Sequence, residues 1–554
     1  MPGTVRRLAS AVLILGLVAG CSPAPTSSSA SPTASPTATS SLAPSPTTAP
    51  PSTSVRPSPA PVPPAEIEVA VAHETAVSLI PKSVDDRAWE PVVATHPTDP
   101  DTVAVVYQHR GPGTACGLNP TIRISHDGGF TWRSTKKSPA AGSGRGVSLH
   151  ASIAWGPGPS AGSTRLYWAN MTTPGCGDGR FSPSTAYSDD EGATWSKLRV
   201  ERETPPWVGG MPEVAVDRNP ASPTFGTVYV GYNWLAPGTH GPGFHLLASA
   251  DFGATWAATE IAPAAGPRGY GDWWRIGYRL RPAPDGGVYA SWYQVDMRRW
   301  DRTQIFSKGG PANVGRLGVA VTRVDFDRAN STFAVGPSRI AATVPETAYS
   351  TSGASAAGTA GNIRPDPMWL HGFDVDQATG HLYLAVAAYG PATGGAPRGT
   401  IQVGRSDDRG ATWSFARLPS AGEIGGRRQS SIRPNLVAGR GSVVVTFHTL
   451  DDVQGGAATI GNAFAVSTDA GATWRTPAAI SKERWRASNL GGVINGTGLR
   501  ERAERLADGD VFWAYGDGRY ATGSKVGRVA IVGTHIRVDS IRSCDPIAGV
   551  RRTC

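Results

Sequence analysis

One eight-residue pattern, S-x-D-x-G-x-T-W, occurs five times in this chain and constrains its fold more than any other feature. The copies begin at Ser125, Ser188, Ser249, Ser406 and Ser467. Successive copies start 63, 61, 157 and 61 residues apart, so much of the chain repeats with a nearly constant period. A fixed period of this length is typical of proteins built from repeated structural units. We therefore expect one array of repeats rather than several unrelated domains.

Each copy has the composition of a tight turn between two β-strands. The Asp side chain can accept hydrogen bonds from backbone N–H groups one or two residues on, and Gly adopts a positive φ without strain. Thr begins the returning strand, and Trp is large enough to fill the seam between neighbouring repeats. We assign this structural role to Asp127, Asp190, Asp251, Asp408 and Asp469.

Strand-like runs around the pattern give the number of repeats. Two such runs precede each copy; in the first repeat the three runs are 91–95, 102–108 and 121–125. The same triplet recurs twice without the pattern, within 275–326 and 502–536. Seven triplets predict an all-β propeller of seven four-stranded antiparallel blades, with six blades as the alternative if one triplet is an insertion. We expect 67–72 to supply the fourth strand of the last blade, which closes the ring and removes exposed sheet edges.

The repeated pattern resembles the Asp box of the sialidase (neuraminidase, or BNR-repeat) superfamily at all five defining positions, and the resemblance covers about 65–554. It implies a β-propeller whose Asp boxes lie between the third and fourth strands, on the face opposite the ligand site. It also implies an extracellular glycan as partner and an exo-sialidase-type glycoside hydrolase as the activity. The alternative is a non-catalytic propeller that binds a glycan, a wall polymer or a protein, because Asp boxes also occur in propellers that are not sialidases.

The resemblance also implies a set of site residues. A sialidase needs three arginines for the sialate carboxylate, a Tyr nucleophile with a Glu base, and an Asp acid. The positions that fit are Arg275, Arg433 and Arg502, with Tyr520 or Tyr293 as the phenol and Glu213 or Glu501 as the carboxylate. Further residues expected on the ligand face are Glu90, Trp273, Trp274, Trp369 and His371. The chain departs from the family in its first blade, where Trp89-Glu90-Pro91 replaces Arg-Ile-Pro and its arginine.

The first 64 residues have a different composition. Residues 1–21 read as an export signal with a basic start and an apolar run, and Val18-Ala19-Gly20-Cys21 resembles a bacterial lipobox with Cys21 as the lipidated residue. A plain secretory signal is the alternative. Residues 22–64 are nearly all Pro, Ser, Thr and Ala, which predicts a disordered stalk that could reach about 130 Å when extended. We expect a propeller at 65–554 that is lipid-anchored to the outer face of the bacterial cytoplasmic membrane, or secreted.

The remaining cysteines agree with an exported protein. Cys116, Cys176, Cys544 and Cys554 form an even set, as expected in an oxidising compartment, and three pairings are open from sequence alone. Cys116 and Cys176 both fall in second-to-third strand loops of adjacent blades. That placement favours the pairs Cys116–Cys176 and Cys544–Cys554.

Charge and motif content limit the partners. The formal net charge is +9, dispersed over the chain, and no basic tract alternates with aromatic residues as a nucleic-acid groove would require. We interpret the charge as a source of surface solubility, or at most of attraction to anionic sugars or wall polymers, and we expect a monomer. Residues 374–380 resemble the start of a calcium loop but lack its later Glu, so we interpret them as a turn capped by Asp side chains and expect no metal or cofactor.

Overall fold

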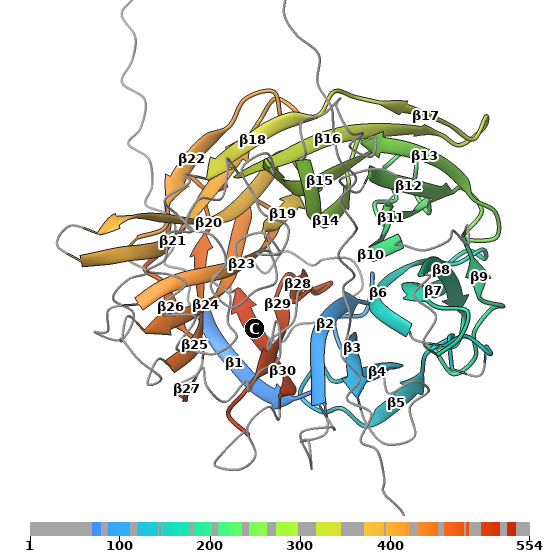
Figure 1. Cartoon of the computed structure of the whole chain (residues 1–554), viewed down its shortest axis with the longest axis horizontal. Helices are drawn as coiled ribbons and strands as arrows, with labels where there is room; N and C mark the ends of the chain where they lie inside the picture. Colours follow the sequence, from blue (N-terminus) through green and yellow to red (C-terminus); the bar gives the residue numbers. More distant parts are fainter. Residues whose placement is uncertain are drawn as a thin grey trace, which may run out of the picture. The chain divides into compact units, whose positions relative to one another are not determined.

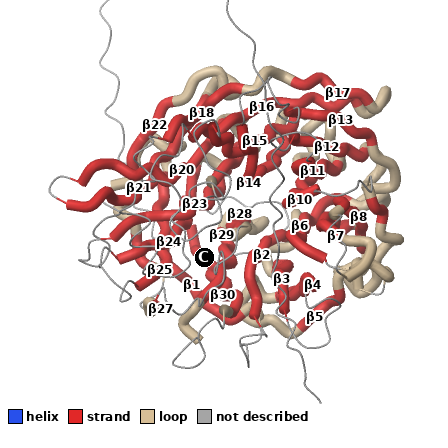
Figure 2. Tube along the Cα trace, in the orientation of Figure 1, coloured by secondary structure: helices blue, strands red, loops and turns tan. Residues whose placement is uncertain are grey.

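The computed structural model describes one unit of the chain, and the statements below refer to its described residues. These are 69–78, 87–110, 119–141, 143–146, 148–176, 181–201, 209–234, 243–262, 273–296, 317–344, 371–392, 395–419, 429–451, 459–480, 483–486, 500–520 and 529–538. Every regular element in these ranges is a β-strand (Figure 2).

The strands form seven antiparallel sheets, which we number as blades 1 to 7. Blade 1 contains β2 (Arg87–Thr95), β3 (Thr102–Arg110), β4 (Asn119–His126) and β5 (Ser134–Lys137). Blade 2 contains β6 (Ser148–Pro157), β7 (Thr164–Thr172), β8 (Ser182–Ser188) and β9 (Arg199–Val200). Blade 3 contains β10 (Gly209–Val216), β11 (Val228–Trp234), β12 (Gly243–Ser249) and β13 (Ala257–Ala262).

Two of the remaining blades carry a fifth strand. Blade 4 contains β14 (Trp273–Pro282), β15 (Gly287–Asp296), β16 (Leu317–Asp327), β17 (Thr332–Val335) and β18 (Arg339–Val344), which also pairs with β16. Blade 5 contains β19 (Gly372–Val375), β20 (Leu382–Ala392), β21 (Gly395–Ser406) and β22 (Ser414–Arg417). Blade 6 contains β23 (Gln429–Gly439), β24 (Ser442–Asp451), β25 (Thr459–Ser467), β26 (Ala478–Ala479) and β27 (Trp485–Arg486), which also pairs with β25.

Blade 7 joins the two ends of the propeller. It contains β28 (Arg502–Arg505), β29 (Val511–Asp517), β30 (Ala530–Val538) and, as its outermost strand, β1 (Val69–Ala76). In Figure 1 the blue β1 lies beside the red β30. The prediction that an N-terminal segment closes the ring is confirmed, with the strand a few residues beyond the predicted 67–72. The seven predicted blades are also confirmed, and the six-bladed alternative is wrong.

The first strand of each blade lies innermost, and consecutive first strands contact one another around a central channel (Figure 1). The hydrophobic core lies in the seams between blades. One cluster joins Ile122 of blade 1 to Trp155 and Trp168 of blade 2, and another joins Trp132 of blade 1 to Phe512 of blade 7. Each blade therefore buries its apolar faces only against its neighbours, which explains why the repeats must form a closed array.

The five copies of the repeated pattern form the turns predicted for them, between the third and fourth strands of blades 1, 2, 3, 5 and 6. In each copy Ser Oγ donates to Asp Oδ1 at 2.7–2.8 Å. The Thr N–H donates to Asp Oδ1 at 2.7–2.8 Å, and Thr Oγ1 donates to Asp Oδ2 at 2.5–2.6 Å. The Gly at the fifth position of the pattern has φ between 77° and 90° in every copy. These five turns, which we call the Asp-box turns, lie at the same end of the channel as the turns that connect first and second strands.

The predicted signal and stalk, 1–21 and 22–64, lie outside the described residues, as do Cys21, Cys116, Cys544, Cys554 and Trp369. No helix in the described part of the chain has the length and apolar character needed to span a membrane.

Candidate functional site

Five of the seven innermost strands carry a β-bulge near their first residues, at the channel end opposite the Asp-box turns. The bulged residues are Glu90, His150, Met211, Gly277 and Arg433, with φ between 51° and 70°. A left-handed backbone is uncommon for residues other than glycine, and such conformations gather at functional sites. Bulges also re-aim side chains next to active sites. We therefore treat this end, which we call the bulged end, as the candidate functional site.

Two of the bulged residues form a hydrogen-bonded pair between blades 1 and 2. His150 Nδ1 lies 2.8 Å from Glu90 Oε2, and the side chains of Glu90 and His150 are 4% and 20% exposed. Burial acts to raise the pKa of Glu90, but His150, Arg500 and Arg433 outweigh it and hold that pKa below its usual value. An ionised carboxylate can only accept, so Nδ1 of His150 carries the hydrogen that it donates to Glu90.

Arg500 connects His150 to blades 3 and 7. It precedes β28 of blade 7, and its guanidinium donates to the backbone oxygens of His150 in blade 2, at 2.5 Å, and of Pro212 in blade 3. The Arg500 side chain is buried. A single arginine thereby ties the bulges of two blades to a third blade that does not adjoin them in the ring.

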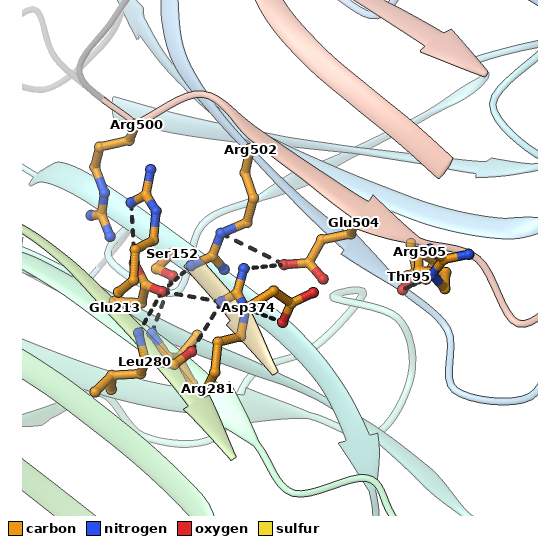
Figure 3. A network of polar contacts seen from close by, with 12 residues as sticks. Thr95, Ser152, Glu213, Leu280, Arg281, Asp374, Arg500, Arg502, Glu504 and Arg505 are labelled. Atoms are coloured by element: carbon orange, nitrogen blue, oxygen red, sulfur yellow. Dashed lines mark hydrogen bonds and ion pairs between the residues drawn. The ribbon is translucent and has the colours of Figure 1, made fainter. Parts of the chain in front are cut away.

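Glu213 of β10 is the centre of a network of ion pairs inside the channel (Figure 3). Its carboxylate lies 3.4 Å from Arg279 Nη1 and 3.4 Å from Arg281 Nη1, and it also pairs with Arg502. The N–H of Leu280 donates to Glu213 Oε1 at 3.0 Å. Burial acts to raise the pKa of Glu213, but Arg502, Arg279 and Arg281 outweigh it and lower it to about 2. Three arginines from blades 4 and 7 thus hold one carboxylate of the protein itself.

The network continues away from the bulged end through Arg281. Its Nε donates to Asp374 Oδ1 of blade 5 at 3.0 Å, and its Nη2 donates to Glu504 Oε1 of blade 7 at 3.4 Å. Asp374 Oδ2 accepts the N–H of Ala438 in blade 6. Burial raises the pKa of Asp374. The positive charge of Arg281 lowers this pKa and the negative charge of Glu504 raises it, and the pKa stays above its usual value. These contacts link blades 3 to 7 across the channel.

A second histidine–carboxylate pair lies between blades 6 and 7. His448 Nε2 is 2.7 Å from Glu501 Oε2, and His448 Nδ1 is 2.7 Å from Asn462 Oδ1. Glu501 Oε1 accepts the N–H of Gly516 at 3.1 Å. His448 and Glu501 are almost completely buried, so this pair joins two blades rather than facing a ligand.

The structure brings together two of the residues predicted for catalysis, Glu213 and Arg502, but as partners of each other. Arg433 is buried at the bulge of β23, close enough to Glu90 to lower its pKa. Tyr520 lies near Arg519 and Asp517 instead. Burial raises the pKa of Tyr520, the positive charge of Arg519 lowers it, and the negative charge of Asp517 raises it. No contact of the described residues joins Tyr520 to Glu213.

The residues predicted for the ligand face are placed unevenly. Glu90 lies at the bulged end. His371 is fully buried, with Nε2 at 2.7 Å from Ser291 Oγ and its ring edge-on to Tyr293, so it packs between blades 4 and 5 instead of facing outwards. Burial lowers the pKa of His371 well below its usual value. Arg275, Trp273 and Trp274 lie on β14, but their side chains are outside the described part of the structure, as is Trp369.

Sequence reasoning missed Arg279, Arg281, Glu504 and Asp374 as members of the channel network. One signal was present: arginines alternate as Arg279-Leu280-Arg281 on β14 and as Arg500-Glu501-Arg502 where the chain enters β28. Residues two apart on a strand point to the same side, so this alternation places paired arginines towards the channel.

Two further predictions concern cysteines and the calcium-like segment. Cys176 is part of a disulfide, and its partner lies outside the described residues, so the pairing with Cys116 stays a prediction. In the segment 374–380, Asp376 Oδ1 accepts the N–H of Ala378 at 2.8 Å, which is the predicted turn capping. Among the described residues, no group of three His, Cys, Asp or Glu side chains is placed to hold a metal ion.

No protein-family model matches the chain, and no curated protein matches it. Solved structures that resemble it include an α-L-arabinofuranosidase from Fusarium graminearum with an iminosugar inhibitor, at 12% identity over 70% of this chain and 93% of that chain, with a TM-score of 0.38. An α-L-arabinanase from Penicillium chrysogenum with arabinobiose matches at 14% identity over 70% and 92%, with a TM-score of 0.39. An ulvan lyase, a polysaccharide lyase, matches at 12% identity over 82% and 94%, with a TM-score of 0.44. At these TM-scores the likeness carries no inference about the activity of this chain.

Proposed function

We propose that this propeller is a cell-surface glycoside hydrolase that acts on an acidic extracellular glycan at the bulged end. The observation that carries the proposal is the Glu90–His150 pair. Two ionisable residues of adjacent blades are held in left-handed bulges at the channel, in contact with each other. Such a pair supplies a positioned proton-transfer group, which hydrolysis of a glycosidic bond requires.

In this proposal His150 accepts a proton at Nε2 as the attacking water bonds to the anomeric carbon, and Glu90 stabilises the imidazolium that forms. The glycosidic C–O bond breaks in the same step, the leaving sugar oxygen takes a proton from solvent, and the imidazolium then releases its proton to solvent. The carboxylate of Glu90 keeps the ring in the tautomer that leaves Nε2 free to accept. The positive charges of Arg433 and Arg500 beside the pair, together with the net charge of +9, favour a glycan that carries carboxylates.

An exo-sialidase is the specific form of this activity that the sequence predicts. The structure gives it one obstacle, because Arg502 is already paired with Glu213 and is not open to a sialate carboxylate. Sialoside hydrolysis is therefore measured as one of several activities, and the proposal does not depend on it. The panel also contains an α-L-arabinofuranoside and a uronate-containing polysaccharide.

The test measures product formation by the wild type, His150→Gln and Glu90→Gln. We expect turnover of at least one acidic substrate by the wild type and a loss of about 100-fold or more in kcat for His150→Gln. Glu90→Gln should also lower kcat, because the amide no longer stabilises the imidazolium. Unchanged kcat in both variants would refute the assignment. No turnover of any substrate, with retained binding on a glycan array, would favour the non-catalytic binding propeller.

We further propose that the propeller is anchored through Cys21 and held away from the membrane by the 22–64 stalk. A Cys21→Ala variant should move from the membrane fraction to the medium. Release of the wild type into the medium would instead favour secretion.

A further inference from the structure

We propose that the channel end on the Asp-box side is a second binding site, for a sugar-sized molecule that carries a carboxylate or phosphate group. The described residues enclose a cavity of about 500 Å³ at this end, formed where the innermost strands finish. That volume lies within the range of small-molecule sites. The bulged end and its Glu90–His150 pair are not part of this cavity, which is lined by the other ends of the same strands.

The charges that line the cavity are biased towards arginine. Five guanidinium groups, those of Arg218, Arg281, Arg440, Arg502 and Arg505, face three carboxylates, those of Asp374, Asp376 and Glu504.

All three carboxylates are already engaged. Asp374 accepts from Arg281 and from the N–H of Ala438. Asp376 accepts from the N–H groups of Ala378 and Gly441, and Glu504 pairs with Arg281 and Arg502. The acids of the cavity are therefore engaged by the protein, and Arg281 and Arg502 also pair with Glu213. Among the described residues this leaves Arg218 and Arg505 as lining arginines without a carboxylate partner.

Arg218 is the arginine best placed to bind an anion. Its Nη1 donates to the backbone oxygen of Thr95 at 2.9 Å and to Thr95 Oγ1 at 3.3 Å. Among the described residues no carboxylate lies within ion-pairing distance of Arg218, and its half-buried side chain lines the cavity. Its Nη2 and Nε form no hydrogen bond with another described residue. A planar guanidinium that is held at one nitrogen presents the other two as a fork for a carboxylate or phosphate.

Arg505 adds a second cation that forms no ion pair within the described part of the chain. Its Nη1 donates to the backbone oxygen of Gly509 at 2.7 Å, and its Nη2 donates to Ser442 Oγ at 3.0 Å. Thr95 Oγ1 donates to the backbone oxygen of Arg505, and the two residues lie side by side in Figure 3. Thr95 therefore contacts both Arg218 and Arg505. Apolar side chains of Trp155, Val216 and Leu506 complete the wall and suit the carbon face of a small sugar acid.

The experiment measures binding of glucuronate and of inorganic phosphate to the full chain by titration calorimetry, with glucose as the neutral control. We expect saturable binding of at least one anion and none of glucose. Arg218→Gln should weaken the binding by about tenfold or more, since it removes a charge-assisted contact. Arg417→Gln, at an exposed position on β22 outside the cavity, is the matched control and should bind as the wild type does.

Ala507→Glu keeps the test decisive if Arg218→Gln does not fold, because it adds a negative charge to the lining without removing an internal bond. It should weaken the same binding by about tenfold. Binding of glucuronate alone would identify a sugar acid as the ligand type, and binding of phosphate alone a phosphorylated one. No saturable binding of either anion would overturn the proposal. So would binding that survives both cavity variants but is lost in Arg433→Gln, because the anion would then occupy the bulged end.

Discussion

Replacing Glu213 by Gln tests whether the channel network stabilises the propeller. The substitution keeps the shape of the side chain but leaves Arg279, Arg281 and Arg502 buried without their shared carboxylate. Removing one partner of a buried ion pair typically costs about 3–5 kcal/mol. The pKa of Glu213 gives a second measure. Its fall from the ordinary 4.5 to about 2 corresponds to about 3 kcal/mol of differential interaction.

The sign of the pH dependence follows from that direction. The folded pKa lies below the unfolded value, so the stability contributed by the carboxylate is fully present above about pH 4.5. It is lost as the pH falls from there towards 2. In Glu213→Gln this contribution is absent at every pH. The difference in stability between wild type and variant should therefore be largest at neutral pH and shrink below pH 4.5.

The assay is urea unfolding followed by tryptophan fluorescence at several pH values, because buried tryptophans such as Trp168, Trp292 and Trp513 report on the seams. Glu191→Gln is the matched control: its side chain is 42% exposed and pairs with a half-exposed histidine, so we expect a change below about 0.5 kcal/mol. An unfolding midpoint of Glu213→Gln equal to that of the wild type would refute the reasoning. A difference that stays constant from pH 7 to pH 2.5 would refute the link to the ionisation of Glu213.

The other predictions concern the turns and the ring closure. Asp127→Ala removes three side-chain hydrogen bonds of the first Asp-box turn and should lower the free energy of unfolding by about 1 kcal/mol or more, measured by urea unfolding, while the activity per folded molecule stays unchanged. An activity loss with intact stability would mean that the functional face is wrongly assigned. Glu74→Gln weakens the closing strand, because Glu74 accepts from Arg519 at 2.6 and 2.9 Å and from Tyr515, and should cost about 2–4 kcal/mol and speed proteolysis near β1. Glu483→Gln, which changes the 73% exposed partner of the same arginine, should have little effect on either measurement.

The local parts of this fold could be predicted from sequence because the forces that make them act over a few residues. Ser125, Asp127 and Thr131 lie within seven positions of one another, and their side chains bond each other and the backbone between them. The same bonds recur in every copy, so the pattern marks one turn in each of the five blades that contain it. Strand alternation around it then gave the seven blades and the closing N-terminal strand.

The candidate site depended on contacts that no local pattern contains. Glu213 and Arg502 were both selected as possible catalytic residues, but the ring places them against each other across the channel, where each satisfies the charge of the other. His371 was expected on the ligand face and is enclosed between two blades. Glu90 and His150 meet because equivalent bulges in adjacent blades turn them towards one another.

The sequence by itself therefore determined the repeat, the turn chemistry and the number of blades, because hydrogen bonds between near neighbours and the alternation of strands are written in consecutive residues. Only the tertiary structure decided which charged groups pair, which are buried and which face a cavity. The physical reason is that closing the ring brings together side chains hundreds of positions apart, and burial then requires each charge either to find a partner or to remain next to water.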